Sequence, residues 1–291
     1  MWTLIQLELY KIFRKPRTYI AFAAITALVV LIQMGFYVDG DNYLDFALQS
    51  LTTSFLVEGK VLNGYFMCFV ILQLLLVHVP LLIALVAGDM VSGEANMGTL
   101  RLMLTKPVSR TGFLLAKFIA AATYTLLLLV WMAILALGLS LLVFGANDLV
   151  VLKSSVVTFI VKEDVLWRYA LTFAFAALAM LTVTALAFLL SVFAENSIGP
   201  IVAAISIIIL LTILNTLDLP IFNSFKQFMF TTHMIGWKGF FDVKVNAQRE
   251  AIVGSVENLP AVLTSAGILV LHIVVFLGVA VTVFRKKDIL S

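Results

Sequence analysis

Six long apolar runs are the feature that most limits how this chain of 291 residues can fold. Each has about 20 residues or more, the length that an α-helix needs to cross a bilayer. The runs lie at about 19–38, 65–87, 113–144, 167–193, 199–217 and 260–284. Only 12% of the residues are charged, too few to cover a soluble domain of this size. The sequence therefore predicts an all-α polytopic membrane protein with six transmembrane helices, and it excludes an ordinary soluble enzyme or a disordered chain.

Charged residues divide unequally between the two sides of such a membrane. Six crossings place both chain ends and the loop at 88–112 on one side, which carries 11 basic residues against five acidic ones; the other side carries eight against 11. The 11 basic residues are Lys11, Arg14, Lys15, Arg17, Arg101, Lys106, Arg110, Lys117, Arg285, Lys286 and Lys287. Because positive charge accumulates on the cytoplasmic side, we expect a multi-pass protein of the cell (inner) membrane with both termini cytoplasmic. A net charge of +3 with scattered basic residues argues against a nucleic-acid partner.

Residues 1–17 predict an amphipathic helix in the membrane interface. On a helix, one face is apolar and the opposite face is basic, although Leu4 and Leu7 interrupt the basic face. The apolar face has Trp2, Ile5, Leu9, Ile12 and Phe13, and the basic face has Lys11, Arg14 and Lys15. The alternative is a cytoplasmic tail that carries the usual positive charges. The apolar run that follows is too long for the core of a signal peptide, so we expect the first span to be retained.

The remaining outward segments, at about 39–64, 145–166 and 218–259, are too short for a substantial separate domain. The whole chain, 1–291, is therefore expected to form one transmembrane domain. The segment at 218–259 is rich in aromatic residues, namely Phe222, Phe225, Phe228, Phe230, Trp237, Phe240 and Phe241. This density favours short helices at the outer interface, and a role in substrate exit is the alternative.

The inward loop at 88–112 has the clearest local pattern. Ser92 or Gly93 can begin a helix, with Glu94 favourable in its first turn, and Pro107 ends it. Three apolar residues fall on one face at helical spacing, and they are Met97, Leu100 and Leu104. A simple connector needs no such stripe, so the pattern favours a short helix that docks a cytoplasmic partner.

The same loop resembles that of the ABC type-2 transporter permeases. The shared pattern, E-x3-GTL-x3-L-x2-P-x-SR with a following Lys, is carried by Glu94, Gly98, Thr99, Leu100, Leu104, Pro107, Ser109, Arg110 and Lys117. The sequence departs from it at Asn96-Met97, where charged residues are common, and at Ala116, where glycine often precedes the lysine. The architecture of six spans with an amphipathic N-terminal helix is similar as well.

The resemblance implies the permease subunit of an exporter, and it implies that this subunit pairs with a second copy or a sister permease. It also implies two cytoplasmic ABC ATPase subunits, which would hold the ATP and Mg, with no cofactor in this chain. In that family the loop is the coupling helix, which sits in a groove of the ATPase, and this assigns ATPase coupling to Glu94, Gly98, Thr99, Leu100, Leu104, Pro107 and Arg110. The N-terminal helix, with Trp2, Ile5, Leu9, Lys11 and Arg14, resembles the family's connecting helix.

Catalytic motifs are missing from the sequence. There is no GxxxxGK phosphate loop, HExxH or GxSxG, so we expect no enzyme activity in this chain. One cysteine, Cys68, excludes an internal disulfide and a Cys-based zinc site. Two other classes of function stay open: an ion-coupled secondary transporter or channel, and a non-transporting ABC membrane subunit that drives extracytoplasmic partners.

A few polar residues fall inside the predicted spans. They are His78, His272, Gln73 and Asn215. A proton relay, a metal path or a substrate contact is one interpretation, and hydrogen bonding between helices is the other. No metal site is predicted.

Overall fold

A computed structural model describes residues 1–52, 61–104, 108–152, 157–217, 224–246 and 251–287. Within these residues, six helical runs are long and apolar enough to cross a membrane, and each coincides with a predicted span. They are Pro16–Gly40, Gly64–Asn96, Arg110–Phe144, Lys162–Phe193, Ile198–Thr216 and Leu259–Lys286. The predicted all-α, six-span fold is confirmed, and the chain is a multi-pass membrane protein.

The helices and strands follow one another along the chain in a simple order. The first half contains α1 (Trp2–Arg14), α2 (Pro16–Thr52), α3 (Gly64–Ala87), α4 (Ser92–Asn96), α5 (Thr99–Leu104), α6 (Arg110–Ala133), η1 (Ile134–Leu139) and α7 (Ser140–Phe144). The second half contains β1 (Leu149–Leu152), β2 (Val157–Ile160), η2 (Lys162–Asp164), α8 (Leu166–Phe193), α9 (Ile198–Thr216), α11 (Phe230–Met234), η3 (Ile235–Phe241) and α12 (Leu259–Lys286).

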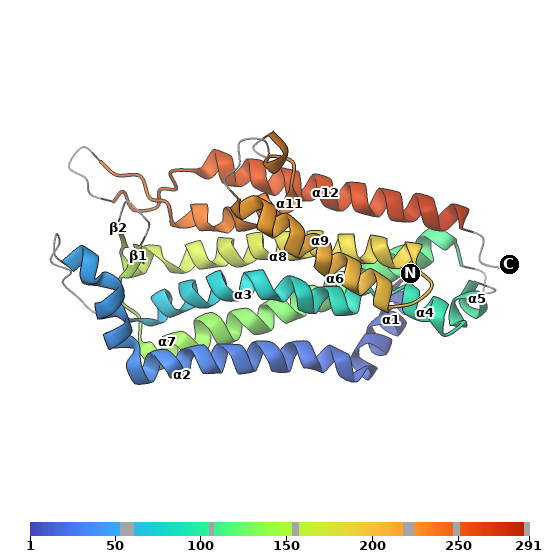
Figure 1. Ribbon diagram of the computed structural model, residues 1–291, viewed down its shortest axis with the longest axis horizontal. Helices are drawn as coiled ribbons and strands as arrows, with labels where there is room; N and C mark the ends of the chain where they lie inside the picture. Colours follow the sequence, from blue (N-terminus) through green and yellow to red (C-terminus); the bar gives the residue numbers. More distant parts are fainter. Residues whose placement is uncertain (53–60, 105–107, 153–156, 218–223, 247–250, 288–291) are drawn as a thin grey trace.

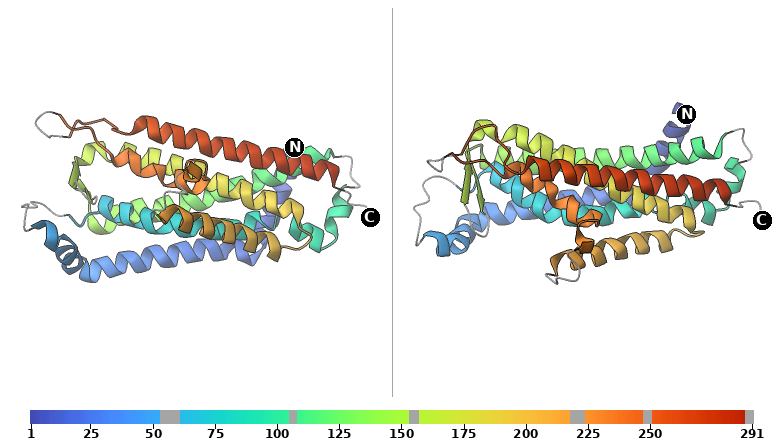
Figure 2. Two further views of the ribbon diagram at one scale, coloured as in Figure 1. Left: turned by 45° about the horizontal axis from the view of Figure 1, so that its top comes forward. Right: turned by 90° about the horizontal axis from the view of Figure 1, so that it is seen from above.

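The long helices lie side by side in one elongated bundle (Figures 1 and 2). One end of the bundle, which we name the loop end, carries α4, α5 and both chain termini. The opposite end, named the hairpin end, carries β1 and β2. Both termini thus lie toward the same end, as an even number of crossings requires.

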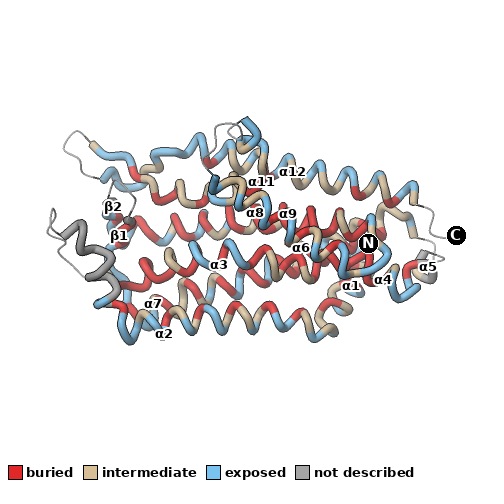
Figure 3. The backbone as a smooth tube through the Cα atoms, in the orientation of Figure 1, coloured by how far each residue is buried: buried red, intermediate tan, exposed pale blue. Residues whose placement is uncertain are grey.

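Helix α8 is the centre of the bundle. It packs against α3, α6, α9 and α12, and 61% of the most apolar window of its span is buried, against 17% for the spans of α9 and α12. The buried backbone in Figure 3 accordingly follows the inner helices, while α2 and α12 are mostly exposed or half-buried. The outer helices therefore offer their apolar side chains to lipid or to another membrane protein.

The third predicted span is a single helical run whose middle part, η1, is π-helical. A π-helical turn disturbs the regular backbone bonding of an α-helix. The Gln33 side chain of α2 compensates at this place: its Nε2 donates to the Leu135 carbonyl at 3.1 Å and to Ser140 Oγ at 2.8 Å. A buried side-chain amide therefore joins α2 to the far half of the third span.

A two-stranded hairpin interrupts the helical architecture. Strands β1 and β2 are antiparallel, with Leu149 opposite Ile160. Sequence analysis missed this hairpin, although Leu149-Val-Val-Leu and Val157-Thr-Phe-Ile are rich in the β-branched residues that favour strands.

The segment that follows α9 contains short helices, as expected, but it lies deeper than the outer interface. The Phe230 ring contacts the rings of His272 and Phe276, which lie near the middle of α12. Farther along, His233 Nδ1 lies 3.1 Å from Ser265 Oγ. Helix α11 and η3 therefore run beside α12 from its middle toward the hairpin end, because their aromatic side chains pack between helices rather than among headgroups. Phe222 lies outside the described residues.

Arg168, at the start of α8, fastens this segment to the bundle. Its guanidinium is fully buried, donates to Asp164 Oδ2 at 2.6 Å, and also donates to the carbonyls of Phe240 (2.6 Å) and Ser255 (2.8 Å). Asp164 Oδ1 in turn accepts from the backbone N–H of Gly254 at 3.0 Å. One buried ion pair thus joins η2, η3 and the segment before α12.

We expect Arg168→Met to destabilise the protein by about 3–5 kcal/mol, because it leaves the Asp164 carboxylate buried without its cation. The measurement is equilibrium unfolding in mild detergent. Adding Asp164→Asn should restore a large part of the loss, whereas Lys162→Met, at an exposed site, should change stability by less than about 0.5 kcal/mol. Equal effects of the single and double variants would refute the role of the ion pair.

Candidate functional site

The loop end is built from two short helices joined by a tight turn. Helix α3 ends at Ala87, α4 covers Ser92–Asn96, and α5 covers Thr99–Leu104. Gly98 lies between α4 and α5 with a φ of 69°, a left-handed conformation that glycine adopts without steric cost. A Cβ on Gly98 would meet no atom within 4 Å, so the requirement for glycine comes from the backbone alone.

The start of α4 is fixed by Ser191 near the end of α8. Ser191 Oγ accepts from the backbone N–H groups of Val91 (3.0 Å) and Ser92 (2.9 Å), two donors that the helix itself leaves unsatisfied. Ser92 Oγ donates back to the Gly88 carbonyl at 2.8 Å. The loop is therefore bonded directly to the central helix of the bundle.

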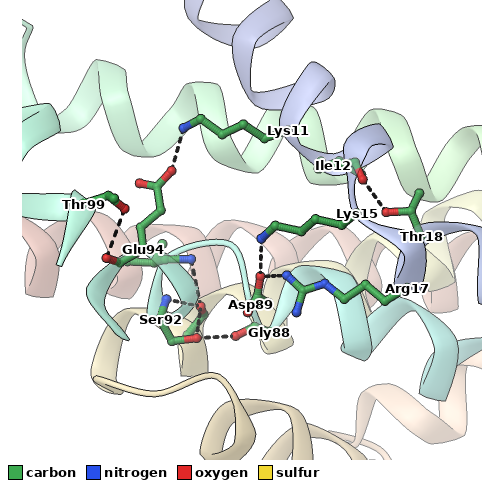
Figure 4. Close-up of polar contacts among 12 residues, drawn as sticks. Lys11, Ile12, Lys15, Arg17, Thr18, Gly88, Asp89, Ser92, Glu94 and Thr99 are labelled. Carbon is green, nitrogen blue, oxygen red and sulfur yellow. Dashed lines mark hydrogen bonds and ion pairs between the residues drawn. The ribbon is translucent and has the colours of Figure 1, made fainter. Parts of the chain in front are cut away.

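Four side chains from α1, α4 and α6 form a buried ring of alternating charges, the charge ring: Glu8, Lys11, Glu94 and Lys117. Lys11 Nζ donates to Glu8 Oε1 and to Glu94 Oε1, both at 2.6 Å. Lys117 Nζ lies 2.8 Å from Glu8 Oε2 and 2.8 Å from Glu94 Oε1. Figure 4 shows Lys11 reaching down from α1 to Glu94. The ring has no net charge, so each buried charge is compensated locally.

A second ionic contact lies beside the charge ring. Asp89, in the turn after α3, is 2.8 Å from Lys15 Nζ and also pairs with Arg17 at the start of α2 (Figure 4). Together the two groups hold the α1–α2 junction against the loop. The loop after α3 and the N-terminal helix are therefore held together by ion pairs.

The charge ring keeps Lys11 protonated. Burial acts to lower the pKa of Lys11, but hydrogen bonds and charges from Glu8 and Glu94 outweigh it, so the pKa lies above its ordinary value. Because the pKa is raised, the ion pair contributes its full stabilising free energy to the folded state at any pH below the pKa of a free lysine. Its contribution is lost only as the pH rises through the raised value.

The residues that were expected to couple to an ATPase differ from one another in exposure. Glu94 is only 7% exposed and Leu100 3%, so both point into the protein. Asn96, Met97, Gly98 and Thr99 are exposed and form the tip of the loop, and Met97 is 59% exposed. The backbone of Leu104 lies in α5, whereas its side chain and the whole of Pro107 lie outside the described residues.

Arg110 has a structural role that sequence analysis missed. Its Nη1 donates to the carbonyls of Arg285 (3.2 Å) and Lys287 (2.9 Å), at the end of α12. Carbonyls at a helix C-terminus lack helical partners, and a cation there is favourable. Arg110 therefore caps the last span, and it would need to leave these carbonyls to reach a partner protein.

The predicted N-terminal helix is present as α1, and it packs against α6. Ile5 and Ile12 are buried and Leu9 is half-buried, as expected for the apolar face, but Trp2 is 68% exposed. The buried face also contains a charge, Glu8, and Lys11 bends toward it. Arg14 stays exposed, with its guanidinium 5.1 Å from the centre of the Tyr10 ring.

The polar residues inside the spans do not form one site. His78 Nδ1 lies 2.7 Å from the Leu74 carbonyl, and His272 Nδ1 lies 2.8 Å from the Ile268 carbonyl, each in its own helix. Asn215 Oδ1 accepts from Thr232 Oγ1 at 3.2 Å, which joins α9 to α11. Among the described residues, no three His, Cys, Asp or Glu side chains gather around a space that could hold a metal ion.

Comparison with known proteins places the chain in a family. A family model described as "Protein of unknown function (DUF2705)" matches residues 25–290, from within α2 to beyond α12. The chain belongs to the DUF2705 family. It is also similar to "Uncharacterized protein YhcI" of Bacillus subtilis (strain 168), with 29% identity over 119 residues. That match covers 39% of this chain and 37% of the relative.

We expect Lys117→Met to release α1 from the loop end, because it leaves two carboxylates buried beside a single, partly exposed lysine. The expected cost is about 3–5 kcal/mol in the opening free energy of α1, measured by amide hydrogen exchange. Arg14→Met is the matched control: Arg14 lies on the same helix, is exposed and is not part of the charge ring, so the expected cost is about 0.5 kcal/mol or less. Equal exchange in the two variants would contradict this account.

Gly98→Ala should loosen the turn between α4 and α5 by about 1–2 kcal/mol, because a Cβ is unfavourable in the left-handed region. Gly98→Asn should cost less, since asparagine tolerates this conformation. Hydrogen exchange of the backbone amides of α4 and α5 measures the difference between the Ala and Asn variants. If Ala is tolerated as well as Asn, the turn does not depend on its positive φ.

Proposed function

We propose that this protein is the membrane-spanning permease subunit of an ABC transporter, working as an exporter with separate ATPase subunits. The observation that carries the proposal is the construction of the loop end: an exposed tip on a short two-helix loop that is bonded to the spans at several points. A flexible connector would need neither the Ser191 anchor nor the charge ring. Such a loop is suited to receive a push from a soluble partner and to pass it to the spans.

The loop end faces the cytoplasm in this proposal. The basic excess of the sequence lies on this side, including Arg14, Lys15 and Arg17 around the α1–α2 junction and Arg110 at the start of α6. The protein then lies in the cell (inner) membrane with both termini inside. Two ATPase subunits would dock there, and they would bind ATP and Mg.

The exposed and the buried residues of the loop have different roles in this proposal. Met97, Gly98 and Thr99 form the exposed tip and would enter a groove of the ATPase. Glu94 and Leu100 face inward and connect the tip to α1 and the core. ATP-driven movement of the tip would therefore pull on α1 through the charge ring, and on α8 through Ser191.

A permease of this kind works as a dimer, with a second copy or a sister permease. Helices α2, α9 and α12 have large exposed apolar faces that could meet such a partner or lipid. The path for cargo would then lie where the two subunits meet, near α3 and α9.

Met97→Asp tests the docking tip. The chain is co-expressed with any ABC ATPase that is encoded beside its gene, and it is purified in detergent with and without nucleotide. A carboxylate in an apolar groove should reduce ATPase recovery by about tenfold or more, at an unchanged yield of the membrane subunit. Asn196→Asp adds the same charge at an exposed site of the same end, and Asp can keep the bond that Asn196 Oδ1 accepts from the Gly199 N–H.

Two outcomes would favour another function. If the wild-type chain retains no ATPase under any nucleotide condition, the proposal fails, and ion-driven transport in ATPase-free liposomes would support a secondary transporter or channel. If the ATPase binds and turns over but no cargo moves, a non-transporting ABC subunit that drives extracytoplasmic partners would account for the docking.

A further inference from the structure

A groove opens between α2 and α3 in the half of the bundle near the hairpin end. Its volume is about 610 Å³, within the range of small-molecule sites. Its walls are mainly apolar, with Leu31, Ile32 and Phe36 from α2 and Phe66, Phe69 and Val70 from α3. Asp39 has non-helical backbone angles, φ −136° and ψ 16°, so α2 kinks at the rim of the groove.

Two glycines of α2 shape the groove. A Cβ on Gly40 would lie 2.8 Å from Leu62 Cδ2, so glycine permits the close approach of α2 to Leu62. A Cβ on Gly35 would meet no atom of the described residues within 4 Å, so Gly35 borders open space. Glycine therefore allows close packing at one position and leaves room for a ligand at the other.

Among the residues that the structure describes, only two polar side chains line the groove, Asp39 and Gln73. Among the described residues, Asp39 has no Lys or Arg partner and accepts only from Asn42 Nδ2, at 2.7 Å. Gln73 has no hydrogen-bond partner among the described residues. It lies nine residues into α3, about 14 Å along the helix, so its amide is at the depth of the hydrocarbon core, where an unsatisfied polar group is costly.

We propose that this groove binds a membrane amphiphile with a cationic, hydrogen-bonding head group. The head group would lie at Asp39, the tail would follow the apolar wall toward Leu31, and a polar group along the chain would satisfy Gln73. The distance from Leu31 to Asp39 is eight residues, about 12 Å of helix, which suits a single alkyl chain. This inference deepens the proposed transport function by naming a ligand class, but the binding needs no ATPase.

The negative charge of Asp39 favours a cationic amphiphile over an anionic lipid or a second copy of the chain. An anionic lipid would place its head group against the Asp39 carboxylate. A second copy of the chain, docked on this groove about a twofold axis, would bring its own Asp39 to the same place, and two like charges would then face each other. A cationic head group compensates Asp39 without either conflict.

The test is photolabelling of the purified chain in phosphatidylcholine nanodiscs, without ATPase. The probes are a dodecylammonium and a dodecyl sulfate that carry the same diazirine in the chain, and the labelled peptides are mapped by mass spectrometry. We expect the cationic probe to label the α2 and α3 walls in a saturable way. Asp39→Asn should weaken its apparent affinity about fivefold and should not weaken labelling by the sulfate, whereas Glu163→Gln, another exposed acid near the hairpin end, should change neither.

Filling the groove supplies an independent variant. Gly35→Trp should reduce saturable labelling about tenfold or more, because the indole occupies the space of the chain. Gly35→Ala leaves the groove open, and Gly267→Trp places the same bulk at an exposed position of α12 where a Cβ also meets no atom; both should label as the wild type does. Equal labelling by both probes, or labelling unchanged by Gly35→Trp, would overturn the proposal in favour of ordinary lipid contact. Labelling that appears only when the protein is monomeric would overturn it in favour of a second copy.

Discussion

The mutual compensation of three buried charges and one partly exposed lysine holds the loop end together. Glu8 and Lys117 are almost fully buried, and a single such charge without a partner would be expensive in this environment. The alternating arrangement removes that cost only when α1, α4 and α6 are all in place. Within the described part of the chain, one oxygen, Glu94 Oε2, has no hydrogen-bond partner even then, so the assembled ring leaves an acceptor that a changed arrangement could use. The N-terminal helix, the loop and the third span therefore keep their relative positions together.

Features that depend on local sequence were predictable. The six spans follow from apolar runs of sufficient length, and α1 follows from its helical periodicity. The start of α4 follows from Ser92, but the predicted single helix with an apolar stripe is wrong, because the helix is interrupted between Asn96 and Thr99, Met97 is 59% exposed and Leu100 is buried. In these cases neighbouring residues carry the signal, and no knowledge of distant contacts is needed.

Features that depend on distant contacts were not predictable. Glu94 and Arg110 are charged residues in a predicted loop, where an exposed position is expected. In the structure, Glu94 is part of the charge ring and Arg110 caps α12. The spacing of Glu8 and Lys11 by three residues on α1 was a usable sign of an ion pair, and Lys117 at the beginning of an apolar run was another. The end of the first apolar run at 38 marked the boundary at Asp39, but nothing local indicated that α2 continues beyond the kink or how deep α11 lies.

The separation of the ring partners along the chain also sets an order of assembly. Glu8 and Lys117 are 109 residues apart, so at a synthesis rate of about 5–20 residues per second the lysine emerges roughly 5–20 s after the glutamate. During that interval the nascent N-terminal helix has the pair within itself, Glu8 with Lys11, to neutralise its buried face. Membrane insertion of the third span then determines the earliest moment at which the charge ring can be complete.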